Sequence, residues 1–300
     1  MTEKAQMKIA FIGLGRMGGP MAGHLAAAGH NVTVVEPNLD TLTRWCQNHE
    51  GTSAPSAGAA ASNAEVVITS LPADAQLQTV AEGILDNLPS GGVWVDHTTA
   101  SVQISRTLAH DANTRDLGFI DAPVSGGVDG ATRGTLAIMA GGTTTDIDRV
   151  RPLLECYAKR ISHMGDAGTG QLTKMTNQIC VVGIGQALAE GLDFAETAGL
   201  DLEKVVGVML SGASASWQMD NRWQAMANSD YEFGFATELM RKDIGLCLAE
   251  ARRSGVGLPV TALVDQFLSD VEALGGKRWD WCSLMERQRG ARRGESNTGG

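Results

Sequence analysis

Ile9-Ala10-Phe11-Ile12-Gly13-Leu14-Gly15-Arg16-Met17-Gly18 is the stretch that decides the fold of this chain of 300 residues. It begins as an apolar run that predicts a short buried strand, and the alanine-rich segment over residues 20–28 predicts a helix after it. The turn between them has the spacing Gly-x-Gly-x-x-Gly, which in this context is typical of a dinucleotide-binding site. Gly13 permits the tight turn, Gly15 lets the backbone approach a pyrophosphate, and Gly18 lets the helix pack closely on the strand.

A second predicted strand, over residues 31–35, ends at Glu36. An acidic residue about 20 positions beyond the glycines is where a ribose 2′-hydroxyl is bound. A 2′-phosphate would meet the Glu36 carboxylate, and Pro37 offers that phosphate neither charge nor donor. Arg16 could reach such a phosphate, but we assign it to the pyrophosphate. The sequence therefore predicts NAD rather than NADP; the alternative is an ordinary strand–helix turn with a surface glutamate.

The composition narrows the classes of function. Hydrophobic residues make up 43% of the chain, and the formal net charge is −10. An acidic chain without a basic stripe is not expected to bind nucleic acid. The sequence shows no signal peptide and no apolar run of the about 18 residues that a membrane span needs. Five scattered cysteines without a Cys-x-x-Cys pair indicate reduced thiols and no metal site. We therefore expect a cytoplasmic protein without a membrane partner.

Strand and helix patterns alternate through the first half of the chain and predict a doubly wound, mostly parallel sheet. Ligands bind such sheets at the carboxyl ends of the strands, where Leu71-Pro72, His97-Thr98-Thr99 and Val124-Ser125-Gly126 would lie. After the first two strands, the predicted strands cover residues 64–70, 92–96, 118–124 and 135–140, and the predicted helices cover 40–48, 75–84 and 101–112. A glycine-rich loop is expected up to Gly134.

From residue 168 onward the periodicity is helical. The predicted helices cover residues 170–198, 202–210, 216–226, 237–254, 259–274 and 280–289. The fold class is therefore α/β, with an N-terminal Rossmann domain over 1–165 followed by an all-α domain over 166–290 for substrate binding and dimerisation. Residues 291–300 lack an apolar anchor and are predicted to be disordered. The longest predicted helix contains Gly183, Gly185 and Gly191. Each lowers the stability of a helix by about 1 kcal/mol, which is tolerable if another helix packs closely against it.

Lys174 is the candidate catalytic residue of the helical half. Together with Asn177 and Gln178 it has the spacing i, i+3, i+4, which places one titratable donor and two amides on one helix face. The positive end of the helix dipole disfavours the ammonium form of a lysine near the first turn. Such a lysine could exchange a proton near neutral pH. Taken alone, the segment also fits a surface lysine with two polar neighbours.

Several ordered motifs resemble those of the β-hydroxyacid dehydrogenases, a group that includes 3-hydroxyisobutyrate dehydrogenase and tartronate semialdehyde reductase. They are the glycine turn, Asp121-Ala-Pro-Val-Ser-Gly-Gly127, Gly130-Ala-x-x-Gly134-Thr-Leu, the Lys174 segment, Lys242-Asp243 and Trp279-Asp280. The resemblance runs from about residue 8 to about residue 289. It implies NAD-dependent transfer of a hydride between nicotinamide and a small 3-hydroxy acid.

The resemblance also implies roles for individual residues. Those that would hold the pyrophosphate are Gly13, Leu14, Gly15, Arg16, Met17 and Gly18. Those that would bind the cofactor elsewhere are Glu36 at the ribose, Leu71, Pro72, Thr99 and Phe235 at the nicotinamide, and Lys242 from a later helix. Those that would bind the substrate carboxylate are Ser125, Gly126 and Gly127. Lys174 would be the general acid/base, with Asn177 and Gln178 orienting the substrate.

Two departures from the family pattern keep alternatives open. Many members have two asparagines where this chain has Asn177-Gln178, and the Asn-Gln form is similar to the tartronate semialdehyde reductase branch. The alternative function is thus reduction of a small aldehyde acid, such as tartronate or succinic semialdehyde or a sulfonate analogue. The second departure is His97-Thr98-Thr99, where the family more usually has Met or Ser followed by Ser-Thr. His97 could contact the substrate, or a neighbouring residue could occupy its ring nitrogens within the fold.

Two further readings concern the chain as a whole. A non-catalytic dinucleotide-binding scaffold would have little need of an intact Lys174, and imine reductases of the same architecture usually lack that lysine. The sequence also predicts a homodimer or homotetramer, from apolar faces in the helical half and from Trp279 and Trp281, which are expected to be exposed.

Overall fold

The computed structural model describes residues 6–296. The chain divides into two compact units, Met1–Lys174 and Met175–Gly300. The sequence places the boundary at residue 165 instead. In the structure, helix α8 (Thr169–Thr197) crosses the division, so its first turns belong to the same unit as the sheet.

The first unit is built on one sheet. In the described part of the chain nine strands form it in the order β3-β2-β1-β4-β5-β6-β8-β7, with β9 beside β8. The neighbours from β3 to β6 are parallel, whereas β8 runs antiparallel to β6 and β7. The strands are β1 (Lys8–Ile12), β2 (Asn31–Val35), β3 (Thr52–Ser53), β4 (Val66–Thr69), β5 (Val93–Asp96), β6 (Gly118–Asp121), β7 (Val124–Ser125), β8 (Leu136–Gly141) and β9 (Ala158–Gly165).

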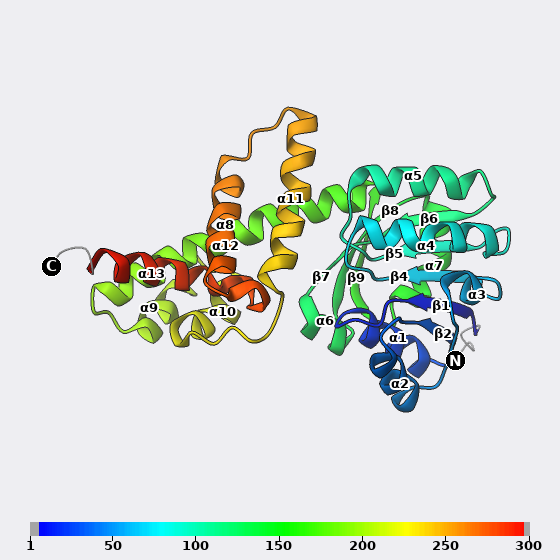
Figure 1. Cartoon of the computed structure of the whole chain (residues 1–300), viewed down its shortest axis with the longest axis horizontal. Helices are drawn as coiled ribbons and strands as arrows, with labels where there is room; N and C mark the ends of the chain where they lie inside the picture. Colours follow the sequence, from blue (N-terminus) through cyan, green and yellow to red (C-terminus); the bar gives the residue numbers. More distant parts are fainter. Residues whose placement is uncertain (1–5, 297–300) are drawn as a thin grey trace. The chain divides into compact units, whose positions relative to one another are not determined.

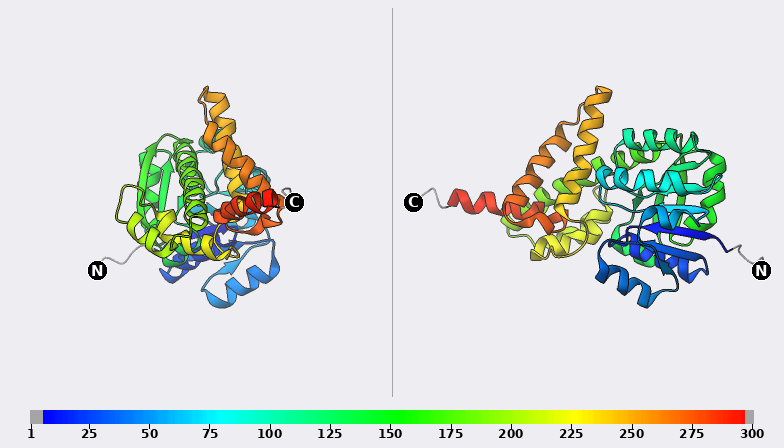
Figure 2. Two further views of the ribbon diagram at one scale, coloured as in Figure 1. Left: turned by 90° about the vertical axis from the view of Figure 1, so that its left-hand side faces the viewer. Right: turned by 45° about the vertical axis from the view of Figure 1, so that its right-hand side comes forward.

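Helices cover both faces of this sheet, as Figures 1 and 2 show. Alternate side chains of β1 enter different cores: Phe11 packs with α1, α2 and α7, and Ala10 packs with α3, α4 and α5. This two-sided burial confirms the predicted doubly wound fold. The helices are α1 (Gly18–Ala27), α2 (Leu39–Asn48), α3 (Ala57–Ala61), α4 (Asp74–Asn87), α5 (Val102–Asn113), α6 (Gly127–Arg133) and α7 (Thr144–Leu154).

Two local predictions in this unit are wrong. The segment predicted as one strand over 118–124 is split into β6 and β7, and Pro123 between them has no backbone N–H for a strand ladder. The segment predicted as a glycine-rich loop forms α6, which ends at Gly134 in a left-handed conformation. The sequence patterns predict none of β3, α3, α7 and β9. In β9, polar and apolar residues are mixed and the exposed positions do not alternate with the less exposed ones.

The second unit is helical, as predicted. Its core gathers side chains from α8 through α13, including Trp281. Its further helices are α9 (Leu202–Met209), α10 (Trp217–Asn228), α11 (Thr237–Ser254), α12 (Pro259–Ala273) and α13 (Leu284–Ser296), with short 3₁₀ turns at Gly276–Arg278 and Trp281–Ser283.

Trp281 corrects one expectation and explains a glycine. The sequence predicts exposed tryptophans at 279 and 281, but Trp281 is buried and Trp279 is half-buried. A Cβ atom on Gly185 would overlap the Trp281 ring, so this glycine of α8 permits close packing. Gly183 and Gly191 have open space at that position, and close packing does not account for them.

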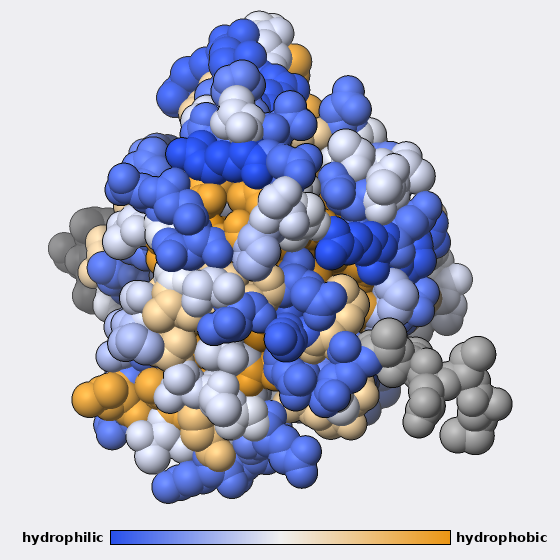
Figure 3. Space-filling model, turned by 90° about the vertical axis from the view of Figure 1, so that its right-hand side faces the viewer, coloured by the Kyte–Doolittle hydropathy of each residue, from blue (hydrophilic) through white to orange (hydrophobic). Residues whose placement is uncertain are grey.

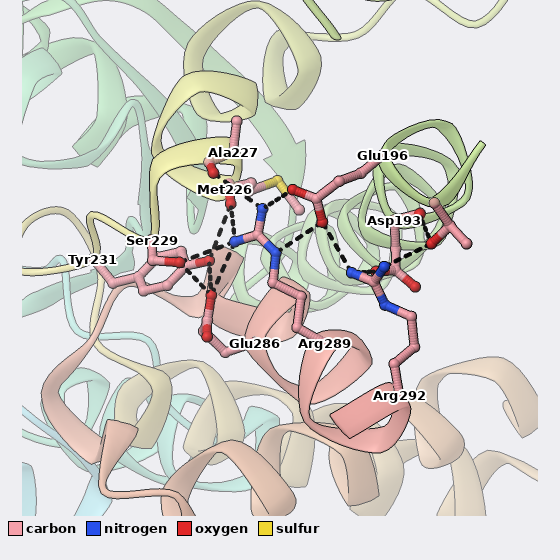
Figure 4. Close-up of polar contacts among 10 residues, drawn as sticks. Asp193, Glu196, Met226, Ala227, Ser229, Tyr231, Glu286, Arg289 and Arg292 are labelled. Atoms are coloured by element: carbon pink, nitrogen blue, oxygen red, sulfur yellow. Dashed lines mark hydrogen bonds and ion pairs between the residues drawn. The ribbon is translucent and has the colours of Figure 1, made fainter. Parts of the chain in front are cut away.

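Ion pairs attach the later part of the last helix, beyond its buried first residues Leu284 and Met285. Arg289 of α13 donates to Glu196 of α8 at 2.7 Å and 3.1 Å, and to Glu286 at 3.1 Å (Figure 4). Arg292 pairs with Asp193 at 2.6 Å. Helix α13 consequently continues to Ser296, into the predicted disordered tail, because ion pairs replace the apolar anchor that the sequence lacks. Residues 297–300 lie outside the described part of the chain.

One face of the molecule is drawn in Figure 3. Hydrophilic residues cover most of it, and apolar residues appear on it in small scattered groups. Among the described residues, no helix is both long enough and apolar enough to cross a membrane.

Candidate active site

The glycine turn connects β1 to α1 with the geometry that its spacing predicts. Gly13 has φ +95, a value that side chains disfavour, and α1 begins at Gly18. A Cβ atom on Gly18 would overlap the carbonyl oxygen of Gly13, so only glycine allows this helix to start so close to the strand. At Gly15, by contrast, no heavy atom lies within 4 Å of where a Cβ atom would be. This exposed, open backbone fits the approach of a pyrophosphate to the start of α1.

Glu36, directly after β2, is joined to this turn. Its Oε2 accepts a hydrogen bond of 2.8 Å from Leu14 N, and its Oε1 accepts one of 3.0 Å from Asn38 N. An ionised carboxylate has about four acceptor sites. The side chain is therefore held beside the glycine turn with acceptor capacity left for ribose hydroxyls.

The segments after β4 and β5 are held together by buried polar groups. Thr98 Oγ1 accepts a hydrogen bond from Leu71 N at 3.0 Å, which fixes Leu71 beside the segment that contains Thr99. Asp96, the last residue of β5, accepts from Thr98 N at 3.0 Å and from Thr69 Oγ1 at 2.7 Å. Burial raises the pKa of Asp96 to about 6.

The loop proposed for the substrate carboxylate follows β6. Ser125 is half-buried at the end of β7, and Gly126 and Gly127 are exposed with φ values of +130 and +62. Both glycines therefore adopt conformations that residues with a Cβ atom rarely adopt. At Gly127, as at Gly15, no heavy atom lies within 4 Å of where a Cβ atom would be.

Lys174 lies in the second turn of α8 and is 9% exposed. One turn earlier, Gln171 reaches the segment after β5: its Nε2 donates to Thr98 O at 2.7 Å, and its Oε1 accepts from Ala100 N at 3.1 Å. The two bonds flank Thr99. The first unit thus brings the start of α8, with Lys174 on it, to the carboxyl end of β5.

His97 is satisfied within the fold. Its Nδ1 lies 2.6 Å from Ala122 O, and its Nε2 lies 2.9 Å from the hydroxyl oxygen of Tyr157. The imidazole is buried, and this burial lowers its pKa to about 4. Both ring nitrogens are therefore occupied by structural partners, which confirms the structural alternative for this residue rather than contact with a substrate.

The remaining predicted site residues belong to the second unit. Gln178 Nε2 donates to Asp243 Oδ2 at 2.7 Å, and Gln178 Oε1 accepts from Asn177 at 2.9 Å. Lys242 Nζ lies 2.9 Å from Asp243 Oδ1. Asp243 therefore contacts two of the predicted residues, Gln178 and Lys242.

Phe235, also in the second unit, is half-buried in the loop before α11. Its backbone N–H donates to the buried Asp280 at 2.8 Å, and Arg222 pairs with the same carboxylate at 3.4 Å. This arrangement fixes the path of the loop.

Sequence reasoning assigned no role to Asp96, Asp121, Gln171 or Asp243, which hold the predicted residues in place. Asp121 and Asp243 stand inside motifs that carry the family resemblance, but the motifs do not show what the carboxylates contact. The segment Gly168-Thr-Gly170 offers one signal, because a helix start without a local side-chain cap leaves backbone N–H groups for water or for a distant acceptor.

Comparison with known proteins places the chain in a family. A model described as the NAD binding domain of 6-phosphogluconate dehydrogenase matches residues 8–165. A second, described as the NAD-binding domain of NADP-dependent 3-hydroxyisobutyrate dehydrogenase, matches residues 168–287. The chain belongs to the β-hydroxyacid dehydrogenase family and is an oxidoreductase that uses a nicotinamide dinucleotide.

Individual relatives agree with this assignment. An uncharacterized oxidoreductase of Shewanella frigidimarina is 47% identical over 93% of this chain and 97% of its own. The 2-hydroxy-3-oxopropionate reductase of Escherichia coli is 33% identical over 93% and 96%. Among solved structures, a 3-hydroxyisobutyrate dehydrogenase of Mycobacterium tuberculosis, solved with L-serine, is 30% identical with a TM-score of 0.87 over 95% and 100%.

Proposed function

We propose that this chain transfers a hydride between NAD and a small 3-hydroxy acid similar to 3-hydroxyisobutyrate, with Lys174 as general acid/base. The observation that carries the proposal is the attachment of the Lys174 helix to the backbone on both sides of Thr99. Thr99 is a proposed nicotinamide-side residue, so this attachment supports a role for the lysine beside the proposed hydride-transfer site. A titratable group must lie within reach of the proton that it transfers.

Lys174 moves one proton in each direction of the proposed reaction. In oxidation, the neutral amine at Nζ takes the proton of the substrate hydroxyl while the C–H bond electrons leave as hydride. In reduction, the ammonium polarises the carbonyl and returns a proton to the oxygen. The nicotinamide ring, when bound, supplies the hydride acceptor or donor. The protein contributes orientation and the proton.

The acid group of the substrate is assigned to Ser125, Gly126 and Gly127. A hydroxyl and backbone N–H groups are suitable donors for a carboxylate, and both glycines are exposed. Asn177 and Gln178 are proposed to orient the substrate from the next turn of α8. The cofactor is assigned to the glycine turn, Glu36, Leu71, Pro72 and Thr99, with Phe235 and Lys242 from the second unit.

Gln178 favours a second candidate within the same family: reduction of a small aldehyde acid. Its terminal amide accepts from Asn177 and donates to Asp243, so the oxygen and the nitrogen of that amide both have a partner within the protein. The Asn-Gln pair is similar to the tartronate semialdehyde reductase branch, and 2-hydroxy-3-oxopropionate, the name in the Escherichia coli relative, is tartronate semialdehyde.

A panel of substrates separates these candidates. We would measure NADH formation with 3-hydroxyisobutyrate, other 3-hydroxy acids and a 3-hydroxy sulfonate, and NADH consumption with tartronate and succinic semialdehydes. The highest kcat/KM for a 3-hydroxy acid supports the leading proposal, and the highest for a semialdehyde supports the second. Cofactor binding with no turnover of any compound would contradict both and support a non-catalytic scaffold.

A further inference from the structure

Helix α8 begins without a side-chain cap of its own. The residue before it, Gly168, has φ +93 and no side chain that could accept hydrogen bonds from the free N–H groups of the first turn. Asp201 caps α9 and Ser216 caps α10, whereas α1, α4, α6, α11 and α12 also start without a side-chain cap. What distinguishes α8 is that a carboxylate far away in the sequence accepts from its start.

Asp121, the last residue of β6, is that acceptor. Its Oδ1 accepts from Gly168 N at 2.6 Å, and its Oδ2 accepts from Gln171 N at 2.8 Å. The carboxylate thus takes two of the free backbone donors at the start of α8. A negative group at this end of a helix is also favoured by the helix dipole.

Two glycines allow the helix start to reach this carboxylate. A Cβ atom on Gly141 would lie 2.5 Å from Asp121 Oδ1, and one on Gly170 would lie 2.5 Å from Asp121 O. Both distances are far inside van der Waals contact. The close approach of α8 to β6 and β8 is therefore built into the sequence.

Gln171 makes a second attachment, to the neighbouring strand. It is fully buried, and both ends of its amide bond the backbone beside Thr99, at Thr98 and Ala100. Together, Asp121 and Gln171 fix the first turn of α8 to the ends of β6 and β5. Lys174 follows Gln171 by three residues, on the adjacent turn of the same rigid helix.

We propose that Asp121 and Gln171 are the positioning residues of Lys174. This inference rests on the proposed function, in which Lys174 exchanges the substrate proton. Asp121 fixes where the helix starts, and Gln171 fixes its register against the Thr99 segment. Together they determine where Nζ lies relative to the reacting carbon and how its proton is exchanged.

Asp121 acts through the helix and does not contact the substrate. The side chain is fully buried, and both of its oxygens are occupied by backbone N–H groups. Burial raises its pKa to about 7, and the two hydrogen bonds act in the opposite direction. A carboxyl group with this pKa is often a proton donor, but here the geometry leaves it no access to a ligand.

The test uses the full-length protein with two isosteric changes. Asp121→Asn keeps the shape and turns an amide donor toward one of the two N–H groups. Gln171→Met removes both bonds of the amide. A displacement of about 1 Å at a reacting group costs about 100-fold, so we expect kcat to fall roughly 10–100-fold in each variant. The apparent pKa in the kcat–pH profile should shift, and the Kd for NAD should change less than about threefold.

Matched controls separate positioning from a loss of stability. Asp201→Asn removes a carboxylate that also accepts two backbone N–H groups at a helix start, and Gln186→Met removes a buried amide from the same α8. Both controls should keep the wild-type kcat and pH profile. Hydrogen exchange of the amides over residues 168–174 should accelerate in the Asp121 and Gln171 variants only, with or without substrate.

Three outcomes decide the inference. If Lys174→Ala keeps its activity, the proposed function fails and this inference fails with it. If Lys174→Ala is inactive but both variants keep kcat and its pH profile, only the positioning role is overturned. Unchanged hydrogen exchange over residues 168–174 would overturn it even without activity data. Should Gln171→Met not fold, Asp121→Asn carries the test alone through the same kcat, pH-profile and hydrogen-exchange measurements.

Discussion

Glu36 and Leu14 are joined by a hydrogen bond of 2.8 Å from the backbone N–H of Leu14 to the Glu36 carboxylate. This bond holds a negative charge at the turn that the sequence assigns to the cofactor pyrophosphate. A 2′-phosphate carries a further charge of about −2. Two close unit charges at an effective dielectric near 20 differ by a few kcal/mol between attraction and repulsion.

We therefore expect the enzyme to prefer NAD over NADP. A difference of about 2 kcal/mol corresponds to a roughly thirtyfold ratio of kcat/KM, measured for both cofactors at saturating substrate. Glu36→Ala combined with Pro37→Arg should narrow or reverse the ratio. Glu65→Ala is the control, because Glu65 also accepts a backbone N–H, from Lys8, outside the cofactor site. Equal values for the two cofactors in the wild type would contradict the assignment of Glu36.

Replacement of Lys174 by alanine should abolish turnover with little effect on cofactor binding. The loss of a general acid/base typically lowers kcat about 10²–10⁴-fold. Single-turnover rates measure the loss of the chemical step, and the Kd for NAD, measured on the same preparation, shows whether cofactor binding is intact. The control is Lys204→Ala, an exposed lysine of α9 paired with Asp201. A variant at 174 that keeps more than about a tenth of the wild-type kcat would exclude the lysine as the acid/base.

The chain should form a homodimer or homotetramer through the second unit. Large apolar side chains are exposed there, including Phe194 (75%) and Val208 (76%). Light scattering at micromolar concentration should give a multiple of the 31.5 kDa chain mass. Phe194→Ser should weaken the assembly, whereas Leu39→Ser, at a similarly exposed residue of the first unit, should not. A wild-type monomer would refute this prediction.

His97 should make the protein less stable in acid. The unfolded chain binds its proton near pH 6.5, whereas the folded chain does so only near pH 4. Stability from the neutral ring is thus complete above pH 6.5 and is lost as the pH falls toward 4, by roughly 3 kcal/mol. Urea unfolding of the wild type and of His97→Gln between pH 7.5 and 4.5 measures the difference.

The comparison with the variant is essential here, because burial raises the pKa of Asp96 and of Asp121 and so acts in the opposite direction over this range. The advantage of the wild type over His97→Gln should shrink as the pH falls. His110→Gln, at an exposed histidine of α5, should show no such change. A difference between wild type and His97→Gln that stays constant with pH would contradict the linkage.

Two glycines of α8 should respond oppositely to the same substitution. Gly185→Ala forces a methyl group into the Trp281 ring, and overpacking of this kind typically costs about 1–3 kcal/mol. Gly191→Ala meets no neighbouring atom and should stabilise the helix by about 0.5–1 kcal/mol. Thermal unfolding of the two variants tests whether Tm falls for Gly185→Ala and rises for Gly191→Ala. Equal changes in Tm would show that packing against Trp281 is not the cause.

Sequence patterns predicted the elements that are specified locally. The glycine turn and the bounds of α11 each depend on residues that are close in the chain. The sequence also predicted that Glu36 lies beside the glycine turn. In the order strand, turn, helix, strand, the carboxyl ends of the two parallel strands meet at the same edge of the sheet. What it missed depends on topology: β9 pairs with β8, and Asp121 meets α8, through contacts that no local pattern encodes.

The cap on α8 has a consequence for the order in which the protein folds. Asp121 precedes Gly168 by 47 positions, so the first turn of the helix can be completed only after β6 has docked in the sheet. During synthesis the amino-terminal part of a chain emerges first and folds first. The sheet can therefore serve as the template on which α8 begins as the chain is made.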